Sequence, residues 1–398
     1  MKIIYISQHF PPEIGAAQGR AHDMANNLTE LGHSVTMLTT FPNQEDTMRL
    51  YKKEKWNKID VRRSFRVKDT KASAKRRLAN YLSFMVSSTL TGFFMKRPDV
   101  VYATSPQLFV GVAGYMLSRF HRTKYVLEVR DLWVDFAEVL SQFNNKHLLK
   151  LARKLEIFLY KRADRIITVT YGYKERLISL GIPEGKIEVI TNGVDFTQLP
   201  KATSNHIRNE LHLEGQFVIL FAGNIGAAQG LDMLIPVGKK LQEDGVPVTF
   251  LLIGEGVEKA RLQKEVKESA LRNIVFLSSK KKNELQAYYE EADICLVTLK
   301  KHPLFSITIP SKLFDCMAVG KPILLGVEGE AKHIVLENGA GVAFEPENPL
   351  DLLEKIRFLL TNPALLKEME QNVERTVMEK YNRKQLAQQL ATILETIR

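Results

Sequence analysis

Short apolar segments alternate with amphipathic helical patterns along nearly the whole chain, and the alternation restarts once. The first series of predicted strands covers residues 3–6, 35–39, 100–103, 125–129, 166–169 and 187–190. The second covers residues 218–222, 248–253, 274–276, 294–297, 323–325 and 342–344. Strands that alternate with helices form parallel sheets covered by helices on both faces. The sequence therefore predicts an α/β chain with two doubly wound, Rossmann-like domains.

The length of the chain supports this division, because 398 residues exceed what one hydrophobic core usually organises. The polar stretch "DFTQLPKATSNHI" at residues 195–207 interrupts the pattern and is the predicted linker. We expect an N-terminal domain over residues 1–198 and a C-terminal domain over residues 199–380. A final helix over residues 381–398 is expected to pack back on the N-terminal domain.

The hexapeptide "IGAAQG" occurs twice, at residues 14–19 and 225–230. Each copy lies at the first strand-to-helix turn of its series, where the strand ends of a doubly wound sheet open on a crevice. Small residues allow close approach of a ligand, and the helix that follows offers unpaired N–H groups to an anion. Neither copy has the G-x-G-x-x-G spacing, so the sequence does not favour a nicotinamide dinucleotide site.

A second candidate site is the stretch "SITIPSKLFDCMAVGKP" at residues 306–322. Pro310 and Ser311 predict a helix start and Gly320 its end, so Lys312 falls in the first turn. A cation at that end of the helix dipole costs up to ~1 kcal/mol unless an anion sits there. A phosphate group would turn the cost into a gain; the alternatives are a solvated Lys312 or an ion pair with Asp315.

Positive charge is concentrated in residues 52–77, which carry a net charge of +9 out of +11 for the chain. The next eighteen residues, 78–95, contain no charge and are long enough to be considered as a membrane span. Their Ser, Thr and Asn content and their place in an α/β pattern argue against a span. Two interpretations stay open: a buried helix beside a solvated basic loop, or a cationic and apolar patch on an anionic membrane surface. The residues predicted for such a patch are Arg62, Arg63, Arg66, Lys75, Arg76, Arg77, Tyr81, Phe84, Phe93 and Phe94.

Other patterns narrow the class of protein. The basic residues adjoin an apolar helix rather than interleaved aromatic residues, so nucleic-acid binding is not expected. Cys295 and Cys316 are too few for a disulfide framework and have no metal-ligand spacing. No signal peptide is apparent at the N-terminus. We therefore expect a cytoplasmic protein that needs no metal or other cofactor.

Several segments, in order along the chain, resemble a known family. They are "ISQHFPPEIGAAQGRAHDMANNLTELGHSVTMLT", "ITNGVD", "FAGNIGAAQGLDML", "LLIGEGVEKARL" and "SITIPSKLFDCMAVGKPIL". Together they are similar to retaining, nucleotide-sugar-dependent glycosyltransferases of family 4, and most similar to the bacterial branch that builds O-antigens and capsules. The resemblance implies the GT-B fold, in which two such domains face a central cleft.

The resemblance also implies a set of donor-binding residues. Relatives often clamp the donor diphosphate with an Arg and a Lys, but this chain has the neutral Asn224 and Gln229 at those positions. Lys312 must then carry more of the charge, helped by Arg20 or Arg130. Asp315 matches the acidic residue that holds ribose hydroxyls, whereas the first acidic residue of the family's E-x7-E motif would fall at Ile307 and is absent. The remaining implied donor residues are Gly15, Ala16, Gly254, Ser279, Ile309, Pro310 and Ser311; for Gly254, a purely structural turn is the alternative.

The candidate catalytic residues are Arg130, Asp131, Lys312 and Glu13. Relatives often have His-Asp where this chain has Arg130 and Asp131. Arg130 would neutralise the leaving diphosphate, and Asp131 would orient it or meet the acceptor; an Arg130–Asp131 ion pair is the structural alternative. Glu13 is an alternative acid near the acceptor.

The expected activity is transfer of a sugar, with retained configuration, from a UDP-sugar to a polyprenyl-diphosphate-linked glycan. We expect an N-acetylated amino sugar or a deoxy sugar, since Ile307 is apolar. The enzyme would act in capsule or O-antigen synthesis, bound peripherally to the inner face of the cell membrane. Two alternatives stay open: a soluble nucleotide-sugar epimerase of the same fold, and an inactive membrane-associated scaffold.

Overall fold

The structure, a computed structural model, describes residues 1–13, 15–42, 49–68, 74–105, 107–139, 145–195 and 207–397. It divides into two compact units, one formed by residues 1–192 with 383–398 and the other by residues 193–382. The predicted domain boundary after residue 198 and residues 196–206 of the predicted linker lie outside the described residues.

The first unit is built on one mixed sheet with the strand order β3-β4-β2-β1-β5-β6-β7-β8. All neighbouring strands pair in parallel except β3, which runs antiparallel to β4. The strands are β1 (Lys2–Ile6), β2 (Ser34–Thr40), β3 (Tyr51–Trp56), β4 (Ile59–Ser64), β5 (Val100–Thr104), β6 (Lys124–Val129), β7 (Arg165–Thr168) and β8 (Ile187–Val189).

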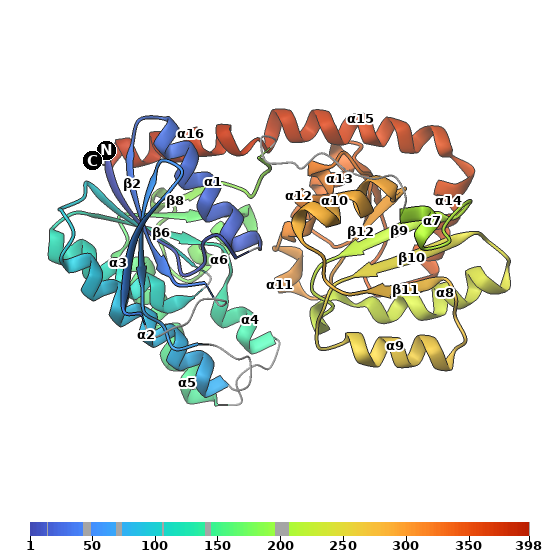
Figure 1. Cartoon of the computed structure of the whole chain (residues 1–398), viewed down its shortest axis with the longest axis horizontal. Helices are drawn as coiled ribbons and strands as arrows, with labels where there is room; N and C mark the ends of the chain where they lie inside the picture. The colour runs from blue at the N-terminus through green and yellow to red at the C-terminus, as the bar shows by residue number, and fades with distance from the viewer. Residues whose placement is uncertain are drawn as a thin grey trace. The chain divides into compact units, whose positions relative to one another are not determined.

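Helices cover both faces of this sheet. Helix α16 (Arg383–Thr396) packs on α1 (Ala16–Glu30), and Leu386, Leu390 and Leu394 of α16 join the core of this unit. Figure 1 shows α1 and α16 over one face of the sheet and α2 and α3 over the other. The helices besides α1 and α16 are α2 (Ala74–Phe93), α3 (Leu108–His121), α4 (Trp133–Val139), α5 (Lys146–Arg162) and α6 (Tyr171–Ser179).

The second unit has an all-parallel sheet with the order β11-β10-β9-β12-β13-β14. Its strands are β9 (Phe217–Ala222), β10 (Val248–Ile253), β11 (Ile274–Leu277), β12 (Ile294–Thr298), β13 (Ile323–Gly326) and β14 (Gly341–Ala343). Its helices are α7 (Ile207–Glu210), α8 (Leu234–Glu243), α9 (Lys259–Glu268), α10 (Lys282–Glu291), α11 (Pro303–Ser306), α12 (Ser311–Ala318), α13 (Glu330–Glu337), α14 (Pro349–Thr361) and α15 (Pro363–Lys380). The prediction of two doubly wound sheets is confirmed.

Each sheet reverses its strand order once, between β1 and β5 in the first unit and between β9 and β12 in the second. Ligands of open α/β sheets bind at such points, outside the carboxyl ends of the strands. Both copies of the hexapeptide follow the strand at this point, although residue 14 lies outside the described residues. Their local structures differ. Ala16–Gly19 form the first turn of α1, whereas Ala227–Gln229 form a 3₁₀ turn that ends at the left-handed Gly230.

The prediction of a basic loop at residues 52–77 is wrong, because much of this segment forms the β-hairpin of β3 and β4. Strands β3 and β4 pair along their length, and Arg63 is buried between them and the β2 end. The Arg63 guanidinium donates to Glu54 (2.6 Å) and to the carbonyls of Thr40 (2.8 Å) and Pro11 (2.7 Å). Arg66 and Phe84 are also buried. These three side chains therefore cannot contact a membrane surface.

The uncharged stretch at residues 78–95 falls mainly in α2. Within the described ranges of the chain, no helix combines the length and the apolar character that a membrane span requires.

Arg63→Ala should lower the free energy of unfolding by about 3 kcal/mol, because it removes the buried guanidinium that links Glu54 to the carbonyls of Thr40 and Pro11 and leaves Glu54 with Lys52 alone. Lys55→Ala, on the exposed side of the same hairpin, should change it by less than about 0.5 kcal/mol. Urea unfolding of both variants measures the difference. Equal losses would mean that Arg63 does not anchor the hairpin.

Candidate active site

The first candidate binding region is the N-terminus of α12 in the second unit. The helix begins at Ser311, directly after Pro310, and Pro310 provides no side-chain hydrogen bond to the first turn. The first N–H groups of a helix have no acceptor within it, so those of Ser311 and Lys312 are available to an anion. Ile309 and Pro310 are buried and Ser311 is half-buried. The side chains of Ile309 and Pro310 therefore pack and shape this turn.

Lys312 lies in this first turn, against the carboxyl end of β9. Its Nζ donates a hydrogen bond of 2.8 Å to Oε1 of Gln229. The same atom lies 3.7 Å from the centroid of the Phe221 ring, in a cation–π contact. A Cβ atom on Gly223 would be 3.4 Å from Nζ, so the ammonium sits directly beside the backbone where β9 ends.

The electrostatic setting of Lys312 is unusual for a lysine. Burial lowers its pKa to about 7, and the neighbouring Cys316 and Asp315 oppose this shift. No carboxylate of the described chain forms an ion pair with it, and its hydrogen-bond acceptor, Gln229, is neutral. The predicted alternatives, a solvated lysine and an ion pair with Asp315, are not what the structure contains. An anion bound here would restore the charge on Lys312.

Two glycines allow the turns after β9 and β10 to touch. A Cβ on Gly254, whose φ is +154°, would lie 1.8 Å from the carbonyl oxygen of Gly223. A Cβ on Gly256 would lie 2.1 Å from the carbonyl oxygen of Ile225. Gly254 thus has the structural role that was the alternative to ligand binding. The sequence analysis did not identify Gly256.

The remaining predicted donor residues of this unit lie nearer the surface. Asn224 and Asp315 are exposed. Ser279 is exposed as well, and its backbone N–H donates to the Glu255 carboxylate at 3.4 Å.

In the first unit, Arg20 of α1 is structural, so its prediction as a donor ligand is wrong. The side chain is 1% exposed, and all its N–H groups are engaged. Nε and Nη2 donate to Glu128 at 3.0 and 2.8 Å, and the remaining bonds go to the carbonyls of Ile190 and Thr191 and to Asn192. Burial would raise the pKa of Glu128, but Arg20 holds it below its usual value.

Arg130 follows β6 and keeps part of its guanidinium free. Its Nη atoms donate 3.3 Å bonds to the carbonyls of Ala16 and Ala17, while its buried Nε has no hydrogen-bond partner in the described chain. Burial lowers the pKa of Arg130 and raises the pKa of Asp131 to about 6. These two described residues form no ion pair, so the structural alternative for them is not observed.

Glu13 is placed by Arg66, whose Nη2 donates to it at 3.3 Å, and it lies 4.0 Å from Nδ1 of His9. The Nε2 atom of His9 is 2.7 Å from the Gln107 amide. His9 and Gln107 are polar groups at the carboxyl edge of the sheet that the sequence analysis did not identify. Gly15 and Ala16 are exposed at the start of α1. The structure thus brings Ala16 and Arg130 together.

The described part of the chain contains no group of three or more His, Cys, Asp or Glu side chains arranged to hold a metal ion. The chemistry that the two regions offer is recognition of negative charge, through the α12 N–H groups, Lys312 and Arg130.

Comparison with known proteins agrees with this arrangement. Residues 17–198 match the family model of Glycosyltransferase Family 4, and residues 203–376 match that of Glycosyl transferases group 1. A putative colanic acid biosynthesis glycosyl transferase of Escherichia coli, WcaI, is 26% identical over 396 residues, covering 95% of this chain and 96% of that protein. The amylovoran biosynthesis glycosyltransferase AmsK of Erwinia amylovora is 22% identical, covering all of both chains.

Among solved structures, Anabaena Alr3699/HepE in complex with UDP-glucose is similar, with a TM-score of 0.72 and 16% sequence identity. The match covers 100% of both chains, which shows that the fold is shared throughout. The chain is therefore a GT-B glycosyltransferase, with an N-terminal unit of the family 4 type and a C-terminal unit of glycosyl transferases group 1.

Proposed function

We propose that this glycosyltransferase moves a sugar, with retained configuration, from a UDP-sugar to a polyprenyl-diphosphate-linked glycan in the synthesis of a bacterial capsule or O-antigen. The observation that carries the proposal is Lys312, a lysine at a helix N-terminus with a neutral partner and a pKa of about 7. A diphosphate is the ligand that this combination suits. The names of the relatives, which make colanic acid and amylovoran, support a bacterial polysaccharide as the product.

In the proposed reaction, the bond between the sugar and the diphosphate stretches and negative charge builds on the leaving oxygen. Fixed N–H groups and a cation aimed at that charge stabilise the transition state more than the ground state. Lys312 and the first turn of α12 would supply both. Asp315, exposed one turn further along α12, would accept hydrogen bonds from the ribose hydroxyls. HepE, a protein of this fold, binds UDP-glucose, which supports a UDP-sugar as donor.

The identity of the sugar is proposed from the absence of an acidic residue at position 307. Ile307 occupies the position where relatives carry the first acidic residue of the E-x7-E motif. An apolar side chain there suits a sugar that lacks a hydroxyl group, and we propose an acetamido or deoxy sugar. Arg130 would meet negative charge of a substrate diphosphate, and Asp131 the acceptor hydroxyl. A pKa of about 6 leaves Asp131 largely ionised at neutral pH.

The proposed membrane contact now rests on the exposed part of the basic segment. Lys75 and Arg76 are exposed and Arg77 is half-buried at the start of α2, and Phe94 is 92% exposed just after its end. Tyr81, Phe93 and Arg62 are half-buried. We propose that these residues hold the protein peripherally on the inner face of the membrane, where a lipid-linked acceptor is embedded.

Lys312→Ala should weaken UDP binding by about 1–3 kcal/mol, because it removes a charge-assisted contact to the diphosphate. Isothermal titration calorimetry with UDP and with uridine measures the loss, and uridine should bind both proteins alike. Lys267→Ala, at an exposed position of α9, is the matched control. If Lys312→Ala keeps the full affinity for UDP, Lys312 does not bind the diphosphate.

Replacing Lys75, Arg76 and Arg77 with Gln should release the protein from vesicles that contain phosphatidylglycerol, since each basic residue near such a surface contributes about 1 kcal/mol. Co-sedimentation at low salt measures binding. The control replaces Lys146, Lys150 and Lys154, three exposed lysines of α5, in the same way. Wild-type protein that ignores these vesicles, or a control that loses as much binding, would exclude this membrane contact.

A further inference from the structure

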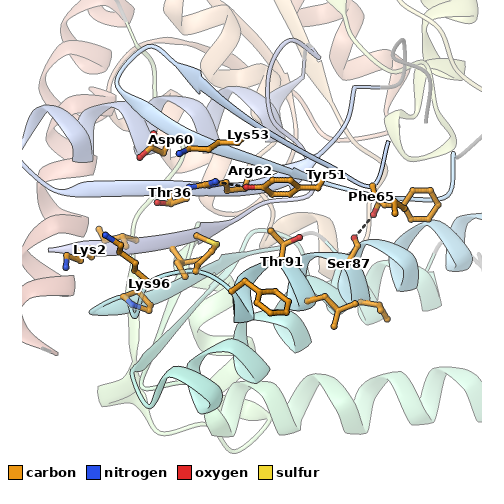
Figure 2. Close-up of a pocket in the computed structure, with 18 of the residues that line it drawn as sticks. Lys2, Thr36, Tyr51, Lys53, Asp60, Arg62, Phe65, Ser87, Thr91 and Lys96 are labelled. Atoms are coloured by element: carbon orange, nitrogen blue, oxygen red, sulfur yellow. Dashed lines mark hydrogen bonds between the residues drawn. The ribbon is translucent and has the colours of Figure 1, made fainter. Parts of the chain in front are cut away.

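A groove of about 1380 Å³ runs along the first unit between α2 and the strands β1, β2, β3 and β4. Figure 2 shows most of the residues that line it. One wall is the face of the sheet and the other is the side of α2. The two walls differ in chemistry, and that difference indicates what the groove can bind.

The α2 wall is apolar. Leu82, Val86, Leu90 and Phe94 follow one another at four-residue intervals, and all four line the groove. Their exposed fractions are 37%, 51%, 53% and 92%, so a continuous apolar row is left open to solvent. At 1.5 Å of rise per residue the row is about 18 Å long. Leu50, 73% exposed, adds to this apolar lining.

The sheet wall is polar and cationic. Lys2, Lys53 and Arg62 of the strands line it, against one carboxylate among the described lining residues, Asp60. Lys96, in the segment that follows α2, adds a fourth cation to the groove. Figure 2 shows Lys2, Lys96, Lys53 and Asp60 toward one end, whereas Phe65 and Ser87 lie at the other. Positive charge is therefore concentrated toward one end of an otherwise apolar channel.

Arg62 lies between these ends and is incompletely satisfied. Its Nη1 donates to the Tyr51 hydroxyl at 2.5 Å. Its Nε is shielded from solvent and has no hydrogen-bond partner in the described chain. The Arg62 side chain as a whole is half-buried and lines the groove, so its charge is available to an anion there.

We propose that this groove binds one acyl chain of an anionic membrane phospholipid, with the phosphate held by the cations of the sheet wall. The inference rests on the proposed membrane contact of this unit and gives that contact a specific site. A free anion would leave the apolar row exposed, and an uncharged chain would leave the cations without a partner. The row of about 18 Å is also slightly longer than the roughly 15 Å that one acyl chain spans, half of the hydrocarbon core of a bilayer.

The probe is lysophosphatidylglycerol, which has one acyl chain and one phosphate, used below the concentration at which it forms micelles. Titration calorimetry of the full chain should give one bound molecule, with weaker binding of lysophosphatidylcholine and none of glycerol 3-phosphate. Val86→Asp with Leu90→Asp should weaken lysophosphatidylglycerol binding at least tenfold by placing charge against the acyl chain. Arg62→Gln with Lys53→Gln should weaken it by roughly tenfold or more, but leave lysophosphatidylcholine binding unchanged.

Leu151→Asp, at an exposed leucine of α5 outside the groove, is the matched control and should bind as the wild type does. Thermal unfolding of each variant checks that it is folded. The proposal is overturned if Val86→Asp with Leu90→Asp binds normally, if the control loses as much, or if glycerol 3-phosphate binds as well as the lipid. If a groove variant loses lysophosphatidylglycerol binding but still binds vesicles, the groove is a lipid site distinct from the general membrane contact. The UDP affinity of the same preparations tests the proposed transferase function separately.

Discussion

A buried ion pair between Arg20 and Glu128 holds together the carboxyl edge of the sheet in the first unit. Glu128 has no exposed surface, and a carboxylate in that position needs compensating charge and hydrogen bonds. Arg20 provides them and also binds the chain at Ile190 and Thr191, so α1, β6 and the residues after β8 are held together. The first carbonyls of α1 are thereby placed where Arg130 donates to them.

Lys312 of the second unit presents the opposite situation. Lys312 stands at the carboxyl end of β9, as Arg20 stands near the carboxyl end of β6, but its partner is a neutral amide. A cation whose donors are all used supports the fold. One that is half-buried beside a neutral group, with a pKa lowered to about 7, is stabilised when an anion arrives. This difference separates the structural arginine from the lysine that we propose as a diphosphate ligand.

The alternation of apolar segments was sufficient to predict both sheets, because parallel strands buried on both faces are marked by short apolar runs. The β3–β4 hairpin was missed because "YKKEKW" is so highly charged, and its pairing depends on β4 and on the burial of Arg63. The positions of Lys312 and Arg130 could be predicted from local patterns. That all N–H groups of Arg20 are used in hydrogen bonds could not be predicted, because its partner Glu128 is 108 positions away in the sequence. Phe221 and Gln229 were likewise assigned no contact with Lys312, since the fold alone brings them together.

The central claim, that Lys312 receives a diphosphate, is tested most directly by counting protons taken up when UDP binds. A pKa of about 7 makes Lys312 roughly nine-tenths neutral at pH 8, whereas UDP is already ionised because a phosphate monoester loses its second proton near pH 6. A bound diphosphate raises the pKa of Lys312, so affinity should fall as the pH rises above 7. Calorimetry at pH 8 in two buffers with different ionisation enthalpies should then show uptake of close to one proton per UDP. No uptake, or equal uptake by Lys312→Ala, would contradict the account.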